Sequence, residues 1–178
     1  RCSTSRSDWC IVNKMSLESL QKIFKYFGEE KKSKIIAKKI ILLRKKKIIQ
    51  TEDLINIINL VKKAKKTKIH NATKTFQSLR VFVNQEVSQL IYGLINSFKI
   101  LPVGGMIVVI TFHSLEDKIV KFFFKNYSEN KNTSRYLPEK KKTKQLFSLI
   151  KKKPIFPSKE ELKINPPSRS AKLRYAIK

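Results

Sequence analysis

The sequence is short of several residue types that mark particular protein classes. Its 178 residues include only 4 glycines, 2 cysteines and 1 tryptophan. The two cysteines, Cys2 and Cys10, have neither the spacing of a zinc site nor that of a thioredoxin-like motif. No apolar run approaches the roughly 20 residues that cross a bilayer, and no secretory signal is visible. These absences predict a reduced, cytoplasmic protein with no membrane partner and no metal site.

Acidic residues are also scarce. The sequence holds 40 lysines and arginines against 13 aspartates and glutamates, which gives a formal net charge of +27. Such an excess attracts a polyanion such as nucleic acid, although a genome biased toward lysine is an alternative source of the charge. The densest basic run, residues 31–47, contains no acid. It predicts RNA-backbone contacts, the alternative being a solvated helix face. The predicted contacts are Lys38, Lys39, Lys45 and Lys46.

Residues 104–124, GGMIVVITFHSLEDKIVKFFF, are the most informative stretch. A Gly-Gly turn leads into an apolar run from Met106 to Phe112. Because the run has no polar alternation, it predicts a strand buried on both faces, as in parallel sheets. A helical pattern follows, with Ser114 as the expected N-cap and acids in the first turn. The polar turn therefore lies at the carboxyl end of a buried strand, where open α/β sheets hold their ligands.

The rest of the chain is mostly helical in pattern. Apolar stripes predict helices over residues 16–27, 29–43 and from 51 onward, and one long helix over 72–101. After residue 124 only two weak strands are predicted, over residues 146–150 and 171–177. These strands do not complete a doubly wound sheet around the buried one. Either the fold is mostly helical with a small sheet, or the first half of an α/β domain lies outside this sequence, and the second alternative is the one expected.

Four segments occur in the same order as in one known family. They are YFGEEKKSKIIAKKI (26–40), HNATKTFQSLR (70–80), GGMIVVITFHSLEDKIVKFF (104–123) and NPPSRSAKLR (165–174). Through them the chain resembles, from about Asp8 to Lys178, the MraW-type small-subunit ribosomal RNA cytosine-N4 methyltransferases. FHSLED is the most specific element, and its pairing with the later RSAKLR argues against coincidence.

This resemblance implies an α/β fold: the second half of a Rossmann-like, S-adenosylmethionine-dependent methyltransferase domain, interrupted by a small helical domain. It assigns residues 15–69 to the inserted substrate-recognition domain and residues 70–178 to the C-terminal half of the methyltransferase domain. Residues 1–14 match poorly, as a junction would. The implied partner is small-subunit ribosomal RNA or the assembled subunit, and not DNA. The family's glycine-rich cofactor loop has no counterpart here, so no cofactor-binding residue is assigned and the fragment alone is expected to be inactive.

The polar turn supplies the candidate catalytic residues. A cytosine amine is a poor nucleophile, and acceptors on its N–H groups would orient it and stabilise the developing charge. The alternative is that these residues cap the helix and that the histidine is a satisfied buried one. The candidates are His113, Ser114, Glu116 and Asp117. Further RNA contacts, predicted within the resembling segments, are Arg80, Arg169, Lys172 and Arg174.

Two function classes stay open at this point. One is methylation of a cytidine N4 amine by an enzyme of which this chain is a fragment. The other is a non-enzymatic, basic helical RNA-binding module associated with the ribosome. Charge alone does not separate them. The double glycine before a buried strand, with acids directly after it, favours the enzyme.

Overall fold

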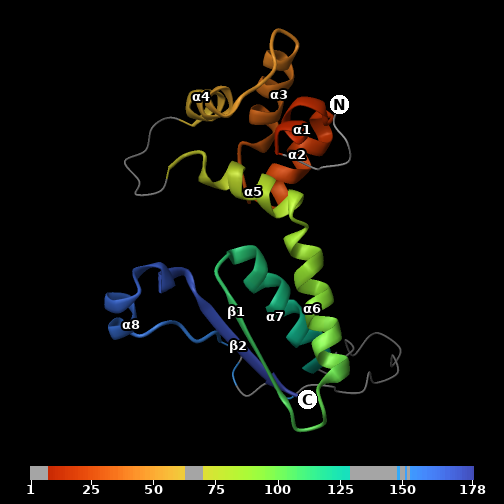
Figure 1. Ribbon diagram of the computed structural model, residues 1–178, viewed down its shortest axis with the longest axis vertical. Coiled ribbons are helices and arrows are strands. Elements are labelled where there is room, and N and C mark those ends of the chain that lie inside the picture. The colour runs from red at the N-terminus through yellow and green to blue at the C-terminus, as the bar shows by residue number, and fades with distance from the viewer. Residues whose placement is uncertain (1–7, 63–69, 129–147, 149–150, 152) are drawn as a thin grey trace, which may run out of the picture. The chain divides into compact units, whose positions relative to one another are not determined.

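The chain divides into two units, each with its own core (Figure 1). The computed structural model describes residues 8–62, 70–128, 148, 151 and 153–178. The first unit is Arg1–Val87 and the second is Ser88–Lys178. Half of the predicted junction and most of the predicted strand over residues 146–150 lie outside the described residues. None of the described helices is long and apolar enough to span a bilayer.

The described part of the first unit is helical. Its elements are α1 (Asp8–Lys14), α2 (Leu17–Tyr26), α3 (Ser33–Arg44), α4 (Thr51–Val61) and α5 (Thr73–Val83). Apolar stripes on these helices face a common core, in which Leu20, Phe24 and Ile36 are fully buried. The Oγ atom of Ser16 accepts a hydrogen bond from the Ser19 N–H at 3.2 Å and caps α2. The helices predicted between residues 16 and 62 are thus confirmed.

The second unit packs helices against a small sheet. Its elements are α6 (Glu86–Ile100), β1 (Met106–Thr111), α7 (Ser114–Ser128), α8 (Lys159–Ile164), the 3-10 helix η1 (Pro166–Ser170) and β2 (Lys172–Ile177). β1 pairs antiparallel with β2, with Met106 opposite Ile177. The buried core joins α6 and α7 to one face of the sheet through Leu94, Ile107, Val120, Phe124 and Ala176. This mixture of helices and a small sheet is what part of an α/β domain contains.

The prediction of one helix over residues 72–101 is wrong. Gln85 takes a left-handed backbone conformation, with φ of 53°, which ends the run of α-helical dihedrals. The N–H of Asn84 closes α5 with a 2.9 Å bond to the carbonyl of Arg80. α5 packs with the first unit, and the second unit begins at Ser88, three residues after this break. The domain boundary placed after residue 69 stays a prediction about the family's insertion.

The prediction that β1 is buried on both faces is also wrong for the described chain. Ile107 and Thr111 are buried, but Met106, Val108 and Ile110 are 50%, 52% and 57% exposed. Within the described residues the only strand that pairs with β1 is the antiparallel β2. The strand thus has the apolar composition of a strand that is buried on both faces, but the side chains on one of its faces are exposed.

β2 has partners along both edges. On the side away from β1, Leu173 and Ile155 exchange two backbone hydrogen bonds of 2.9 Å. Ser148 and Ile177 exchange a similar pair, of 2.7 and 3.1 Å. The strand predicted over residues 171–177 is confirmed, and it is an interior strand although every other described element precedes it.

Gly28 lies just beyond the end of α2, where glycine is common, but it is not the left-handed residue there. That conformation belongs to Glu29, with φ of 48°. A Cβ atom on Gly28 would lie 2.5 Å from the carbonyl oxygen of Lys74 in α5. Glycine is therefore required because the backbone of α5 approaches so closely.

Replacing Gly28 by alanine is expected to lower the free energy of unfolding by about 1–3 kcal/mol, since α5 must shift to admit the methyl group. Gly93→Ala is the matched control, because a Cβ atom there meets nothing within 4 Å. That change inside α6 is expected to stabilise by about 0.5–1 kcal/mol. Urea denaturation followed by circular dichroism measures both. Unchanged stability of Gly28→Ala would show that α5 is free to move.

Candidate functional site

The four candidate catalytic residues lie where β1 leads into α7: His113 directly precedes the helix, and Ser114, Glu116 and Asp117 are in its first turn. Because α7 begins at Ser114, the cap position belongs to His113, whose carbonyl accepts the Asp117 N–H at 3.1 Å. Glu116 reaches back, and its Oε2 atom accepts the N–H groups of Phe112 at 3.0 Å and His113 at 3.2 Å. A carboxylate at the third helical position commonly caps in this way. The N-cap role predicted for Ser114 is therefore wrong, and Glu116 fixes the turn.

Asp117 forms a buried ion pair with Arg174 of β2. The Arg174 Nε atom donates to Oδ1 at 2.6 Å, and Nη2 donates to Oδ2 at 3.3 Å. Lys172 Nζ lies 3.4 Å from Oδ2. The side chains of Asp117 and Arg174 are 12% and 9% exposed. This forked geometry ties the first turn of α7 to β2.

The surroundings of Asp117 favour its ionised form. Burial raises the pKa of this carboxyl, but the hydrogen bond and charge of Arg174, helped by Lys172, outweigh burial and hold the pKa below its ordinary value of 3.8. The carboxylate therefore stays charged at neutral pH, where it can hold the two cations.

The ion pair joins two residues whose predicted roles were different, since Asp117 was expected in catalysis and Arg174 on RNA. Helical and strand periodicity contain no sign of such a pairing, because the partners lie on elements far apart in the sequence. One signal was available: FHSLED and RSAKLR occur together, and each motif supplies one member of the pair. The other members of the turn remain nearer to solvent, with His113 and Glu116 half-buried and Ser114 exposed.

Some basic side chains of the first unit are committed to holding the fold. Lys62 pairs with the buried carboxylate of Glu30. The Nζ atom of Lys32 donates to the carbonyl of Val61 at 2.7 Å. These lysines link the start of α3 to the end of α4 and contribute to structure whether or not RNA binds.

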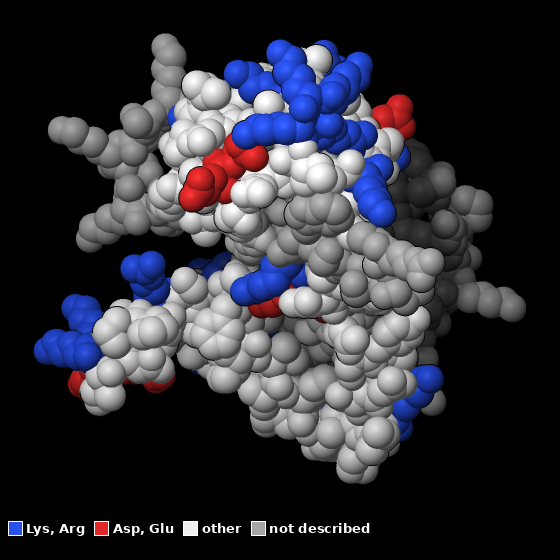
Figure 2. All heavy atoms as spheres, turned by 45° about the horizontal axis from the view of Figure 1, so that its top comes forward, with Lys and Arg blue, Asp and Glu red and all other residues white. Residues whose placement is uncertain are grey.

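Other lysines gather on the solvent side of α3, where Figure 2 shows a concentration of basic side chains. Lys32 and Lys47 are exposed but bond to Val61 and Asp53, and the other exposed members are Lys31, Lys34, Lys38, Lys45 and Lys46. Lys34 and Lys38 lie one turn apart in α3, Lys31 precedes the helix, and Lys45 and Lys46 follow it. Lys39 is half-buried and turns partly away. The structure thus separates an exposed lysine stripe, defined by these five residues, from the lysines that hold the fold.

The remaining predicted RNA contacts are placed in three different environments. Arg80 pairs with Glu86, with 2.9 Å between Nε and Oε1. Arg169 is exposed in η1. Lys172 and Arg174 contact Asp117, and only Lys172 is partly open to solvent. Arg80 lies in the first unit, and the other three lie in the second.

The described residues do not form a recognisable cofactor loop. Gly28 connects two helices, Gly93 lies inside α6, and Gly104 and Gly105 precede β1. A dinucleotide or S-adenosylmethionine cradle instead needs glycines after a strand and before a helix. Within the part of the chain described, no three His, Cys, Asp or Glu side chains group to hold a metal ion.

Comparison with known proteins confirms the resemblance. The MraW methylase family matches residues 2–178. Ribosomal RNA small subunit methyltransferase H of Nitrobacter hamburgensis is 40% identical over 167 residues, which are 93% of this chain and 50% of that protein. The proteins of the same name from Bartonella bacilliformis and Rhizobium meliloti are 41% and 42% identical, covering 94% of this chain and 51% and 50% of their own lengths. The chain spans about half the length of these curated relatives and matches their C-terminal half. It belongs to the MraW methylase family.

Proposed function

We propose that this chain supplies the C-terminal part of an enzyme that methylates the N4 amine of a cytidine in small-subunit ribosomal RNA, with S-adenosylmethionine as methyl donor. The observation that supports this most is the polar turn after β1, which lies within the family match and is fixed by Glu116 and Asp117. The relatives are named as methyltransferases of small-subunit ribosomal RNA. A non-enzymatic module is not favoured, because the match includes this turn as well as the basic helices.

The turn would act by orienting the amine. Methyl transfer to nitrogen is an in-line displacement, so holding the nucleophile in position supplies much of the rate. Glu116 uses Oε2 for the backbone of the turn. Its Oε1 atom, the His113 ring and the Ser114 hydroxyl are then the acceptors that we propose for the cytosine N–H groups. Asp117 would be a positioning residue, which holds the turn through Arg174.

In the enzyme that we propose, the methyl donor and the cytidine are bound by different parts of a longer protein. Because the described residues lack a cofactor loop, no methyl-donor contact is assigned to this chain. We place those contacts in the half of the relatives that this chain does not match. Residues 15–69 would form the inserted helical domain that binds RNA, and residues 70–178 would complete the methyltransferase domain.

A fusion protein tests the function directly. The first half of the Rhizobium meliloti relative, joined to residues 8–178, is expected to form N4-methylcytidine in unmodified small-subunit ribosomal RNA or small subunits supplied with S-adenosylmethionine. Mass spectrometry of the digested nucleosides identifies the product. The intact relative serves as the positive control, and the 178-residue chain alone is expected to give none. A folded fusion that methylates another atom, or nothing, would refute the proposal.

The exposed lysine stripe predicts how the chain binds RNA. Replacing Lys34, Lys38, Lys45 and Lys46 with glutamine is expected to weaken binding to a small-subunit ribosomal RNA fragment. Each lost phosphate contact should reduce the log–log salt slope by about 0.7–0.9. Fluorescence anisotropy at several salt concentrations gives the slope.

A matched control removes the same charge from the second unit. The four exposed lysines Lys99, Lys121, Lys159 and Lys163 are replaced by glutamine. If RNA binds at the exposed lysine stripe, this control should lower the slope much less. Equal losses from both variants would mean that net charge, and not the stripe, determines binding.

A further inference from the structure

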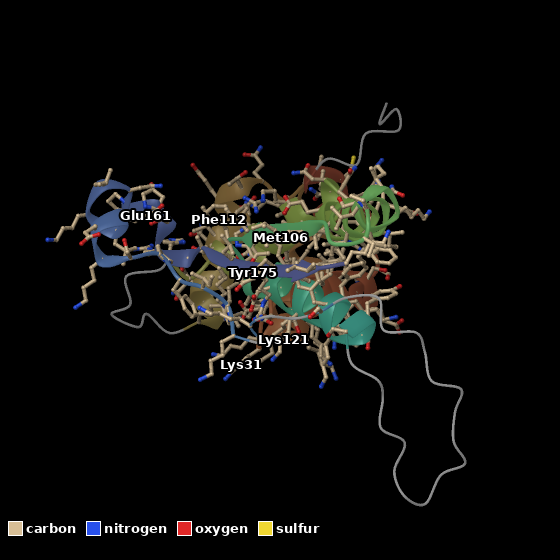
Figure 3. All side chains as sticks on the ribbon, turned by 90° about the horizontal axis from the view of Figure 1, so that it is seen from below. Lys31, Met106, Phe112, Lys121, Glu161 and Tyr175 are labelled. Carbon is tan, nitrogen blue, oxygen red and sulfur yellow. The ribbon has the colours of Figure 1, made fainter. Side chains whose placement is uncertain are left out.

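The second unit has an apolar groove between α6 and α7. Figure 1 shows the two helices side by side, and Figure 3 labels Lys121 on α7. The volume of the groove is about 530 Å³. Most of the residues that line it are apolar, and they come from both helices: Ile91, Leu94 and Ile95 of α6, and Ile119, Phe122 and Phe123 of α7. The two helices thus present apolar side chains beyond those that cover the sheet.

α7 is apolar on two sides, although a helix that covers one sheet needs a single apolar stripe. Val120 and Phe124 belong to the core and are buried. Phe122, midway between them in the sequence, lies on the opposite side of the helix and is 68% exposed. Ile91 of α6, which also lines the groove, is 39% exposed. Large apolar side chains that gather on an open surface mark a site where another molecule binds.

The groove has the length of a short helix. Its lining on α7 runs from Lys118 to Tyr127, which is about 14 Å at about 1.5 Å per residue. At the Tyr127 end the ring of Phe98 lies beside that of Tyr127, with 5.9 Å between the ring centroids. An amphipathic helix places apolar side chains at i, i+3, i+4 and i+7 along such a groove. About two to three turns of a partner helix would fill it.

The rim of the groove is basic. Lys118 and Lys125 are both exposed, and they lie four residues before and three residues after Phe122, so that all three share one face of α7. None of the described residues that line the groove is acidic. The acids of α6 and α7 are engaged in the contacts described above: Glu86, Glu116 and Asp117. The groove therefore attracts a partner that carries negative charge beside its apolar contacts.

We propose that the groove binds an acidic amphipathic helix of a partner protein. The apolar stripe of that helix would contact Ile91, Ile95 and Phe122, and its carboxylates would pair with Lys118 and Lys125. Single-stranded RNA fits less well, because bases bind by stacking on aromatic rings and the α6 wall of the groove contains only isoleucine and leucine. The interaction goes beyond the proposed methylation and does not depend on it, since the polar turn after β1 is not part of the groove lining.

A synthetic peptide tests this proposal. The probe is a labelled helix of about 16 residues, long enough to be partly helical in water, with leucines on one stripe, glutamates beside them and alanine elsewhere. Fluorescence anisotropy with the 178-residue chain is expected to show binding at least tenfold tighter than for a scrambled peptide of the same composition, whose leucines are spread around the helix. Phe122→Ser and the double variant Lys118→Glu, Lys125→Glu should each weaken binding at least tenfold. Circular dichroism should show that both variants fold, because the three side chains are exposed.

α8 provides the matched controls. Ile164 is 86% exposed and does not line the groove, and Lys159 and Lys163 are exposed on the same helix. Ile164→Ser and the double variant Lys159→Glu, Lys163→Glu are expected to bind the peptide as the wild type does. Equal binding of the scrambled peptide, or unchanged binding by Phe122→Ser, would overturn the proposal. So would a homodimer that Phe122→Ser breaks, or binding of single-stranded RNA that this variant weakens tenfold.

Discussion

Replacing Arg174 by alanine is expected to lower the stability of the second unit by about 3–5 kcal/mol, because the charge of Asp117 would be left buried with only the more distant Lys172 beside it. The side chains of Asp117 and Arg174 are almost inaccessible and share two hydrogen bonds. A loss of that size is a large fraction of the total stability of a small domain. Hydrogen exchange of peptides from α7, measured across a urea series, would report the change within this unit.

Arg169→Ala is the control for this experiment. It removes the same side chain from an exposed position in η1, and such surface changes usually stay within about 0.5 kcal/mol. Equal effects of the two alanine variants would show that the ion pair contributes nothing beyond surface charge.

The same pair predicts a dependence on pH. The folded state lowers the pKa of Asp117, so the stabilisation is present above the ordinary value of 3.8 and is lost as the pH falls through the folded pKa. Asp117→Asn should therefore be less stable than the wild type at neutral pH, and the difference should shrink in acid. A difference that is constant with pH would exclude the ionised carboxylate as its cause.

His113→Ala, made in the fusion protein, is expected to lower methylation of the cytidine amine at least tenfold, or about 1.4 kcal/mol of transition-state stabilisation. His113 is half-buried, and its backbone groups already hold the turn. The alanine variant keeps these backbone groups and their hydrogen bonds. Turnover and melting temperature, measured on the same samples, separate activity from stability.

Asp117→Asn gives the contrasting result. If Asp117 positions the turn, this variant should lose activity and melting temperature together, because the ion pair with Arg174 is weakened. Normal turnover of His113→Ala, or a loss only in proportion to unfolded protein, would make the turn a helix cap and not a site.

The sequence predicted helices well where side chains decide the structure. The stripe of Leu20, Ile23 and Phe24 in α2 faces the core as expected. The helix prediction failed at Gln85, where a single left-handed backbone conformation ends the helix. The apolar residues keep helical spacing on both sides of this position, so the sequence pattern shows no break. The strand β1 was located correctly, but its exposure depends on neighbours that no local pattern contains.

The sequence predicted where the candidate site lies, but not which of its side chains contact one another. The turn after β1 was predictable because a strand, a polar turn and a helix follow one another directly in the sequence. The partner of Asp117 was not, since Arg174 reaches it through the pairing of β1 with β2. Likewise, the lysines of residues 31–47 are alike in sequence, and only the position of α4 assigns Lys32 to the fold and Lys38 to the surface.

The order of the strands has a consequence for the folding pathway. β2 comes last among the described elements, yet it lies between β1 and the segment that contains Ser148 and Ile155. Pairing with β1 closes a long loop, so the sheet forms slowly compared with the helices, whose contacts are local. Until β2 arrives, the apolar side chains of β1 lack a partner strand. During that interval the nascent chain is most prone to aggregate, and the speed with which the last strand inserts determines how much of it folds.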